Sequence, residues 1–355
     1  MKKKQATVFV GISGGVDSSV AAARLLDQGY DVVGVFIKVW HPDWLPCAWE
    51  EERRYAMKVA AHLDIPFLTC DAKQEYYDDV AKYFVSEYAA GRTPNPDVMC
   101  NKYVKFGSFL RFAKAKSADY IATGHYAQKK PVNQNESGLF RGLDKDKDQS
   151  YFLWTLTQQQ LVEVLFPIGD TEKQQIRREA QDRSLPTAEK KDSQGICFLG
   201  QVDIYDFLKN FITLIPGKVL NTAGQVVGKH KSSYIYTLGQ RHGFVIDTGL
   251  HTMPHYIVSI DHQNNTITVD TKPPKATQSE KIQLQGCNWI NQPPEKGSQM
   301  SAQVRYRQTP VSVVLHSITD NTAEIELKNK VLLPASGQSC VLYDSNRCLG
   351  GGIIV

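Results

Sequence analysis

A short stretch near the start of the chain, Ser13–Ser18 with the sequence SGGVDS, combines residue types that bind phosphate. Its two adjacent glycines let the backbone curl so that several N–H groups point inward, which suits phosphate oxygens. No lysine follows the glycines, so the stretch differs from the phosphate loop that ends in Gly-Lys-Ser/Thr. Asp17 instead offers a carboxylate that a cation could bridge to phosphate. The stretch predicts a nucleotide site, against the simpler interpretation of a glycine turn in any α/β protein.

Cys100 is the first of two cysteines whose neighbours could activate a thiol. It lies in a segment at 91–101 that is rich in proline and asparagine, which predicts a fixed, non-helical loop. An apolar helix pattern begins at Cys100, and a helix N-terminus stabilises a thiolate. Asp97, three residues earlier, is placed to exchange a proton with a nearby thiol. A cysteine packed as a small apolar residue explains the same pattern, and that alternative stays open here.

Cys197 is the second such cysteine. It lies in the segment 190–200, between Gly195 and Gly200 and downstream of two lysines. Cationic neighbours lower the pKa of a thiol, and flanking glycines let a segment move, so a hinge is expected at these glycines. A buried cysteine among the apolar residues beside it is the alternative interpretation.

The elements that would position these residues alternate between strand and helix. An apolar run at 6–12 predicts a strand that leads directly into Ser13–Ser18, and Ser18 or Ser19 is a candidate cap for the following helix. Such alternation is typical of a parallel sheet covered by helices on both faces, with ligands at the carboxyl ends of its strands. Further strands are expected at 31–37, 66–69 and 120–123, and helices at 50–63, 77–88, 106–113 and 172–183.

Two loops are expected at the same edge of this sheet, 11–18 and 123–126, so one nucleotide could contact both. Ile37, at the end of the second expected strand, is a candidate neighbour for an adenine ring, although its spacing is equally typical of a core residue. Farther along, Lys147, Asp148 and Gln149 lie in a loop of alternating charge. They could contact a large polar substrate or be merely solvated.

The second half of the chain has a different pattern. One helix at 204–211 and a hairpin at 218–227 are followed by short strands, which suggests a small closed barrel. In the expected strand 302–307, Arg305 and Arg307 share one face and Tyr306 the other. We therefore expect three domains, at 1–202, 203–270 and 271–355. The other expected strands are 255–260, 266–270, 311–317, 322–327, 338–343 and 350–355.

Composition excludes several classes of protein. The chain has 355 residues, of which 42% are hydrophobic and 22% charged, as in an ordinary globular protein. No apolar run approaches the roughly 18 residues that span a bilayer, and the run at 6–12 is too short for a secretory signal, so we expect a cytoplasmic protein without a membrane partner. Seven cysteines without a CxxC pair favour reduced thiols over a disulfide framework. A net charge of +4 permits an anionic partner without indicating nucleic acid.

The loop Ser13–Ser18 resembles the PP-loop of the ATP pyrophosphatase superfamily, which holds the pyrophosphate of ATP while AMP is transferred to an oxygen of the substrate. With the other motifs, the chain resembles the bacterial tRNA-specific 2-thiouridylase family over nearly its whole length. Those motifs are GRTPNPD at 91–97 with Cys100 and Asn101, TGHY at 123–126, KDQSYF at 147–152, DSQGICF at 192–198, YTLGQR at 236–241 and VRYRQ at 304–308.

The resemblance implies a reaction. ATP, with Mg²⁺, adenylates the C2 oxygen of the wobble uridine of a tRNA, and a protein persulfide delivers sulfur to C2, giving 2-thiouridine, AMP and pyrophosphate. By match of motifs, Cys197 would carry the persulfide, Cys100 would be the second catalytic thiol, and Asp97 would transfer a proton. Release of the sulfur would leave a Cys100–Cys197 disulfide that a cellular reductant reopens. The sulfur donor would be a cysteine desulfurase or a sulfur-relay protein.

The resemblance also implies two sets of binding residues and a fold. The fold is a parallel-sheet PP-loop domain, a small central α+β domain and a C-terminal β-barrel that contacts tRNA. The target base would leave the anticodon stack to enter the site. The nucleotide set is Gly11, Ile12, Ser13, Gly14, Gly15, Val16, Asp17, Ser18, Ile37 and Gly124. The tRNA set is Asn95, Pro96, Asp97, His125, Lys147, Asp148, Gln149, Arg305, Tyr306 and Gln338.

Three rival functions remain at this point. Another PP-loop synthetase would need the loop but no reactive thiols, and a 4-thiouridine-type sulfurtransferase would share the chemistry but modify another position. A non-catalytic nucleotide binder would produce no AMP. The sequence departs from the family pattern at 41–49, where prolines and tryptophans replace an acidic stretch. The remaining cysteines, Cys47, Cys70, Cys287, Cys340 and Cys348, match no motif and are expected to be structural.

Overall fold

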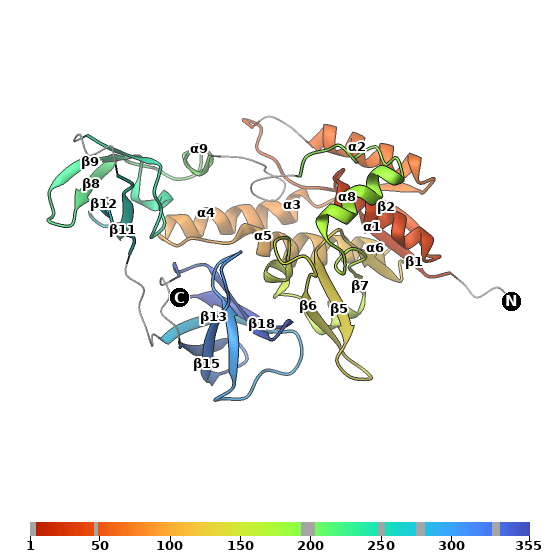
Figure 1. Ribbon diagram of the computed structural model, residues 1–355. Helices are drawn as coiled ribbons and strands as arrows, with labels where there is room; N and C mark the ends of the chain where they lie inside the picture. Colours follow the sequence, from red (N-terminus) through yellow and green to blue (C-terminus); the bar gives the residue numbers. More distant parts are fainter. Residues whose placement is uncertain (1–4, 46–48, 193–202, 248–252, 275–280, 329–333) are drawn as a thin grey trace.

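The computed structural model describes residues 5–45, 49–192, 203–247, 253–274, 281–328 and 334–355 (Figure 1). The first region contains the predicted parallel sheet, in the order β3-β2-β1-β4-β7. Its central strand β1 (Thr7–Gly11) is apolar and β-branched, and Val8 and Val10 are fully buried. The strands beside it are β2 (Asp31–Lys38), β3 (Phe67–Asp71), β4 (Tyr120–Ala122) and β7 (Val164–Leu165), all parallel.

Helices cover this sheet and connect its strands. Three helices contact the loop after β1 or continue from it: α1 (Val16–Asp27), α2 (Trp49–His62) and α8 (Lys173–Asp182). A short helix, α7 (Gln158–Val162), precedes β7 and begins with a capping box at Thr157. Helices α1 and α8 share one apolar cluster, in which Val20 and Ala21 lie with Ile176 and Ala180. The alternation of strand and helix that the sequence predicts is confirmed.

Two long helical stretches each contain a π-helical turn. The first runs through α3 (Lys73–Tyr76), η1 (Tyr77–Ala81) and α4 (Lys82–Ala89). The second runs through α5 (Pro96–Met99), η2 (Cys100–Ser108) and α6 (Phe109–Lys114). The prediction of a non-helical loop through residue 101 is therefore wrong. Asn95 caps the helix and Pro96 occupies its first position, a pairing that starts helices.

The second sheet lies beyond the far end of α4 and is antiparallel except for one parallel pair (Figure 1). Its order is β10-β9-β8-β12-β11, and the predicted hairpin is β8 (Gly217–Asn221) with β9 (Val226–His230). The other strands are β10 (Phe244–Ile246), β11 (Tyr256–Asp261) and β12 (Thr266–Asp270). The short helices α9 (Ile204–Leu208) and η4 (Ser233–Ile235) accompany it, and Phe207 packs against Phe84 of α4.

The third sheet is the predicted barrel, in the order β13-β16-β15-β14-β17-β18, closed because β13 also pairs with β18. Two strands from the first region, β5 (Ala127–Pro131) and β6 (Ser137–Arg141), extend it beyond β18. The first and third predicted domains thus share one sheet. The barrel strands are β13 (Lys281–Trp289), β14 (Gln299–Gln303), β15 (Val311–Ile318), β16 (Thr322–Leu327), β17 (Ser339–Asp344) and β18 (Arg347–Ile354).

One predicted strand of the barrel is wrong. The strand expected at 302–307 ends at Gln303, and Arg305–Arg307 lie in a bend and turn. Arg307 adopts a left-handed φ of 62°, which breaks the alternation that would have put it on the same face as Arg305. No helix in the described ranges is both long and apolar enough to cross a membrane.

Candidate active site

The loop after β1 has the curled backbone that its glycines predict. Gly14 adopts a φ of 75°, and a Cβ there would lie 2.5 Å from the carbonyl oxygen of Glu52. Gly15 caps α1 in an extended conformation, so the expected cap at Ser18 or Ser19 is wrong. Ser18 instead braces the loop, because its Oγ accepts from Ser13 N and donates to Gly15 O, both at 3.2 Å. The side chains of Ile12 and Val16 are buried, so these residues offer only backbone groups to a ligand.

The second loop, at 123–126, meets the first as predicted. A Cβ on Gly124 would lie 2.7 Å from the backbone nitrogen of Ser18, so only glycine allows this approach. The hydroxyl of Tyr126 donates a hydrogen bond of 2.7 Å to Asp17 Oδ1. Burial first, and the neighbouring Asp17 second, raise the pKa of Tyr126 above its ordinary value, so the hydroxyl keeps its proton and remains a donor. Ile37 lies near this edge beside Gly11 but is only 7% exposed.

Asp17 is held by a lysine that the sequence analysis did not single out. Lys173, the first residue of α8, donates from Nζ to both carboxylate oxygens of Asp17, at 2.8 and 2.9 Å. The Lys173 side chain is 12% exposed and that of Asp17 31%. The two residues lie 156 positions apart, so no local motif could have joined them. The loop after β1 thus has a nearby lysine after all, supplied by another helix.

Cys100 is buried one turn inside a helix. The helix begins at Pro96 rather than at Cys100, and the backbone N–H of Cys100 donates to Pro96 O and Asp97 O. The expected position at a helix N-terminus is therefore wrong. Cys100 is fully buried in the main core cluster, and Asp97 is partly exposed in the first turn of α5. In this structure the residue occupies the packed position that the sequence analysis left open as an alternative.

The other two sheets hold the segment before α5 in place. Gln338 donates from Nε2 to Thr93 O at 2.8 Å, and Thr93 N donates to Ser336 O at 2.9 Å. The hydroxyls of Thr93 and Thr237 lie 3.2 Å apart. A Cβ on Gly91 would lie 2.7 Å from the ring of His262. Residues 91–94 are therefore fixed by the barrel on one side and the central sheet on the other.

His125 and the residues 147–149 make contacts within the protein. The ring of His125 is 7% exposed between Phe106 and Phe166, and its Nδ1 lies 2.7 Å from Thr123 Oγ1. Burial, followed by the charge of Lys105, lowers its pKa well below the usual value. RNA could reach this ring only if its neighbours moved.

Asp148 is a structural carboxylate. It accepts from Arg141, from Gly142 N and from both the backbone and the hydroxyl of Ser150. The backbone N–H of Gln149 donates to Tyr126 O, and the side-chain oxygen of Gln149 accepts from Tyr126 N. Lys147 forms an ion pair with Asp192 at 2.9 Å.

Arg305 and Tyr306 lie where the barrel meets its neighbours. Arg305 is partly buried, and its guanidinium donates to Leu238 O in the central region at 3.4 Å. Burial lowers the pKa of Arg305 from its ordinary value. The Tyr306 ring packs on Phe152, with ring centroids 4.4 Å apart. Both are partly exposed, so an RNA could still contact them.

Several predicted residues lie outside the described part of the chain. They are Cys197, the hinge glycines Gly195 and Gly200, and Cys47. Of the cysteines expected to be structural, Cys70, Cys340 and Cys348 are buried. Burial raises the pKa of the Cys70 thiol to about 12 and that of the Cys348 thiol to about 12, which keeps both protonated at neutral pH.

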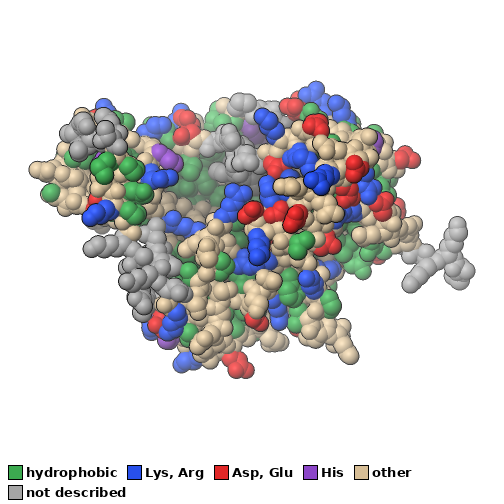
Figure 2. Space-filling model, viewed as in Figure 1, with side chains coloured by type: hydrophobic (Ala, Val, Ile, Leu, Met, Phe, Trp, Pro, Cys, Tyr) green, Lys and Arg blue, Asp and Glu red, His purple; other side chains and the backbone are tan. Residues whose placement is uncertain are grey.

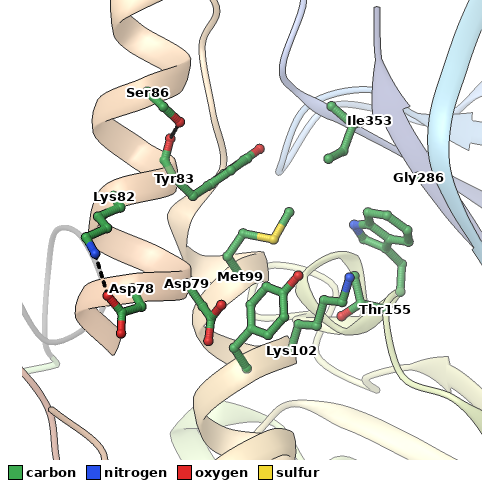
Figure 3. Close-up of a pocket in the computed structure, with 12 residues that line it drawn as sticks. Asp78, Asp79, Lys82, Tyr83, Ser86, Met99, Lys102, Thr155, Gly286 and Ile353 are labelled. Atoms are coloured by element: carbon green, nitrogen blue, oxygen red, sulfur yellow. Dashed lines mark hydrogen bonds and ion pairs between the residues drawn. The ribbon is translucent and has the colours of Figure 1, made fainter. Parts of the chain in front are cut away.

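A cleft of about 500 Å³ opens elsewhere, between the long helices and the barrel (Figure 3). Tyr83 and Met99 point into it from the helices, and Ile353 faces them from β18. None of the predicted site residues lines it, although Met99 precedes Cys100 in the chain. Its size alone does not make it the place of reaction.

Comparison with known proteins gives matches along the whole chain. A tRNA methyl transferase HUP domain model matches residues 6–201, a tRNA methyl transferase PRC-barrel domain model 205–271, and an aminomethyltransferase beta-barrel domain model 279–354. The tRNA-specific 2-thiouridylase MnmA of Listeria monocytogenes is 43% identical over 98% of this chain and 94% of that protein. The corresponding protein of Stenotrophomonas maltophilia is 44% identical over 98% of this chain and 93% of its own.

A solved structure gives a weaker match. The U34-tRNA thiolase NcsA from Methanococcus maripaludis is 16% identical over 55% of this chain and 61% of that chain, with a TM-score of 0.37. A likeness this low carries no argument about function. The argument about function rests instead on the sequence matches that cover nearly the whole chain.

Proposed function

This chain belongs to the tRNA-specific 2-thiouridylase family, and from that premise we propose that it thiolates C2 of the wobble uridine, position 34, in tRNA. It is a tRNA sulfurtransferase that uses ATP. The single observation that carries the proposal is the identity of 43% over 98% of the chain to a tRNA-specific 2-thiouridylase. The products are 2-thiouridine, AMP and pyrophosphate.

The nucleotide would bind where the loop after β1 meets the loop after β4. Support comes from Gly14 and Gly124, because a Cβ on either would press against neighbouring backbone, so only glycine allows the close approach that brings the two loops together. The first turn of α1 adds the positive end of its dipole. Described residues offer no cluster of three metal-binding side chains, so Mg²⁺ would arrive with the phosphates and take at most one or two protein carboxylates, Asp17 among them.

Adenylation converts the C2 oxygen of uracil from a poor leaving group into a good one. The C2 oxygen of uracil leaves poorly, but once it attacks the α-phosphorus and pyrophosphate departs, the same oxygen belongs to AMP. The terminal sulfur of a persulfide on Cys197 then attacks C2, and the C2–O bond breaks with release of AMP.

Cys100 completes the transfer. Its thiolate attacks the Sγ of Cys197, so the transferred sulfur stays on C2 while a Cys100–Cys197 disulfide forms, and a cellular reductant reopens it. Asp97, in the turn before Cys100, would accept or return the proton. The sulfur donor would be a cysteine desulfurase or a relay protein. Because Cys197 lies outside the described residues, the distance between the two sulfurs remains a prediction.

The tRNA would lie across the segment 95–97 and the barrel. Asn95 and Pro96 would contact the flipped base, and Arg305 and Tyr306 the surrounding RNA, because these residues keep exposed surface. We propose that His125, Lys147, Asp148, Gln149 and Gln338 contact tRNA directly only if their present partners within the protein are exchanged for RNA.

The test is reconstitution with ATP, unmodified tRNA and a sulfide source, followed by nucleoside mass spectrometry. Formation of AMP together with 2-thiouridine at position 34 supports the proposal. Sulfur found as 4-thiouridine at another position would favour the rival sulfurtransferase, and ATP consumption without thiolated tRNA would favour another PP-loop synthetase.

A further inference from the structure

One carboxylate next to the nucleotide loop is surrounded by three cations. Asp192 lies 2.9 Å from Lys147 Nζ, 2.8 Å from Lys173 Nζ and 2.8 Å from an Arg177 guanidinium nitrogen. Lys173 and Arg177 are four residues apart on α8, so they share a face, and Lys147 comes from the loop after β6. We call Lys147, Lys173 and Arg177 the cation cluster.

The cation cluster adjoins the loop after β1 through a shared lysine. Lys173 Nζ binds Asp17 and Asp192 at once, each at 2.8 Å. Both Lys173 and Asp17 lie in the first turn of a helix, α8 and α1 respectively, so the positive ends of two helix dipoles meet here. On the face shown in Figure 2, Lys and Arg side chains lie interleaved with Asp and Glu over α2 and α8.

Two members of the cation cluster are held by contacts other than those with Asp192. Arg177 donates from one nitrogen to the carbonyls of Ala188 and Lys190, both at 3.0 Å, so its position does not depend on Asp192 alone. The backbone N–H of Lys173 donates to Asp144 at 2.9 Å, which fixes the start of α8. Burial would raise the pKa of Asp192, but hydrogen bonds and charges from Lys173 and Lys147 outweigh it and lower that pKa to about 2. Asp192 is therefore fully ionised at neutral pH.

We propose that the cation cluster is the binding site for the pyrophosphate end of ATP, and that Asp192 is the counter-ion that these phosphates displace. The inference rests on the proposed function. A PP-loop lacks the lysine by which the other phosphate loop reaches the terminal phosphates, and Lys173 supplies one from α8. The three cations share two carboxylates, Asp192 and Asp17, so positive charge remains that a polyphosphate with three or more negative charges would balance better.

The position of Lys173 favours a nucleotide over an RNA phosphate. Its side chain is 12% exposed, and its ammonium group already lies on the carboxylate of the PP-loop. A phosphate there must come from a ligand that reaches into the loop, as ATP would.

The test is calorimetric binding of Mg²⁺-pyrophosphate and, separately, of AMP to the full-length protein. Lys173→Met should weaken pyrophosphate binding at least about tenfold, the loss expected for one strong charge-assisted contact, and leave AMP binding within about twofold. Asp192→Asn should tighten pyrophosphate binding several-fold, because the competing carboxylate is gone. Arg178→Met is the matched control, since Arg178 is the exposed neighbour of Arg177 on the same helix.

Unchanged pyrophosphate binding in Lys173→Met would overturn the inference. So would weaker binding in Asp192→Asn, which would make Asp192 a ligand rather than a competitor. A loss of tRNA affinity with unchanged pyrophosphate affinity would assign the cations to RNA instead. If Lys173→Met does not fold, Lys147→Met with Asp192→Asn decides the same point. Failure of the proposed function is distinct, because the reconstitution would then yield no 2-thiouridine at position 34, whatever the pyrophosphate affinities of these variants.

Discussion

The side-chain amide of Gln338, in the barrel, donates a hydrogen bond to the backbone carbonyl of Thr93, 2.8 Å away in the first region. A second, longer contact of 3.4 Å reaches Pro94 O. Thr93 and Pro94 lead directly into the helix that contains Asp97 and Cys100. A barrel residue assigned to tRNA by family resemblance therefore also positions the proposed catalytic segment.

Gln338→Ala should lower kcat by about five- to tenfold and change the Kd for tRNA by less than about threefold. Loss of one such hydrogen bond costs about 1 kcal/mol, which is enough to populate displaced positions of the segment. Single-turnover thiolation and tRNA-binding titrations would separate the two effects. Gln299→Ala, at an exposed position of β14, is the control. An unchanged kcat together with a large loss of tRNA affinity would instead indicate that Gln338 contacts tRNA directly.

Gly124→Ala should weaken ATP binding. The added Cβ would lie 2.7 Å from Ser18 N and 2.8 Å from Asp17 C, and because these are backbone atoms the nucleotide loop itself must shift. We expect ATP affinity to fall by at least about tenfold and stability by about 1–3 kcal/mol. Gly297→Ala is the comparison: its φ of 86° strains an alanine, but nothing lies within 4 Å of the added Cβ, so it tests a strained substitution far from the two loops. If both variants bind ATP normally, the two loops do not form the nucleotide site.

Cys100→Ala and Cys70→Ala form a matched pair, because both residues are at most 2% exposed. Each should lose a similar amount of stability, on the order of 1 kcal/mol. Only Cys100→Ala should stop 2-thiouridine formation. It should still release pyrophosphate, because adenylation needs no thiol, and AMP in a single turnover, because attack of the Cys197 persulfide on C2 does not use Cys100. Mass spectrometry of the tRNA and a nucleotide assay would measure the two products. Equal thiolation by the two variants would exclude Cys100 as the second thiol.

Arg305→Ala should reduce the slope of log K for tRNA against log salt by about one, the change expected for one lost phosphate contact. The structure supplies an alternative role, since Arg305 donates to Leu238 O and joins the barrel to the central region. If Arg305 has only that role, Arg305→Ala would lower the free energy of unfolding without changing the slope of log K for tRNA against log salt. Arg307→Ala, an exposed neighbour in the same turn, shows how much any nearby charge contributes.

Features with a local cause could be predicted from the sequence. The buried run of β1 and the glycines after it indicate a strand entering a curled loop, and that is what forms. The start of α5 could also have been found, because an asparagine followed by proline is a local helix-start signal. The expected strand at Arg305 failed because alternation of residue types cannot reveal the left-handed turn at Arg307.

Features with a distant cause could not be predicted. Lys173 meets Asp17 across 156 positions, and the hairpin of β5 and β6 joins a barrel whose other strands begin at Lys281. Such pairings are decided by packing of whole elements, which no short motif records. The burial of His125 likewise follows from Phe106 and Phe166 packing around it.

That burial gives the protein an acid-sensitive histidine. Burial, with Lys105 nearby, lowers the pKa of His125 in the folded state, so as the pH falls below about 6.5 the unfolded chain takes up the proton first. The stabilising effect of the neutral ring is therefore present above that pH and is lost below it, by at most about 1.4 kcal/mol per pH unit. Burial also lowers the pKa values of His230 and His262, which add to the loss.

Denaturant unfolding between about pH 7 and pH 5 would measure this dependence. His125→Gln should be less stable than the unaltered protein at pH 7, because the packing between Phe106 and Phe166 is disturbed, but its stability should fall less steeply as the pH decreases. His62→Gln, at an exposed position of α2, should retain the full slope. An unchanged slope in His125→Gln would mean that the ring takes up its proton equally readily in the folded and unfolded chain, and that its burial carries no electrostatic cost.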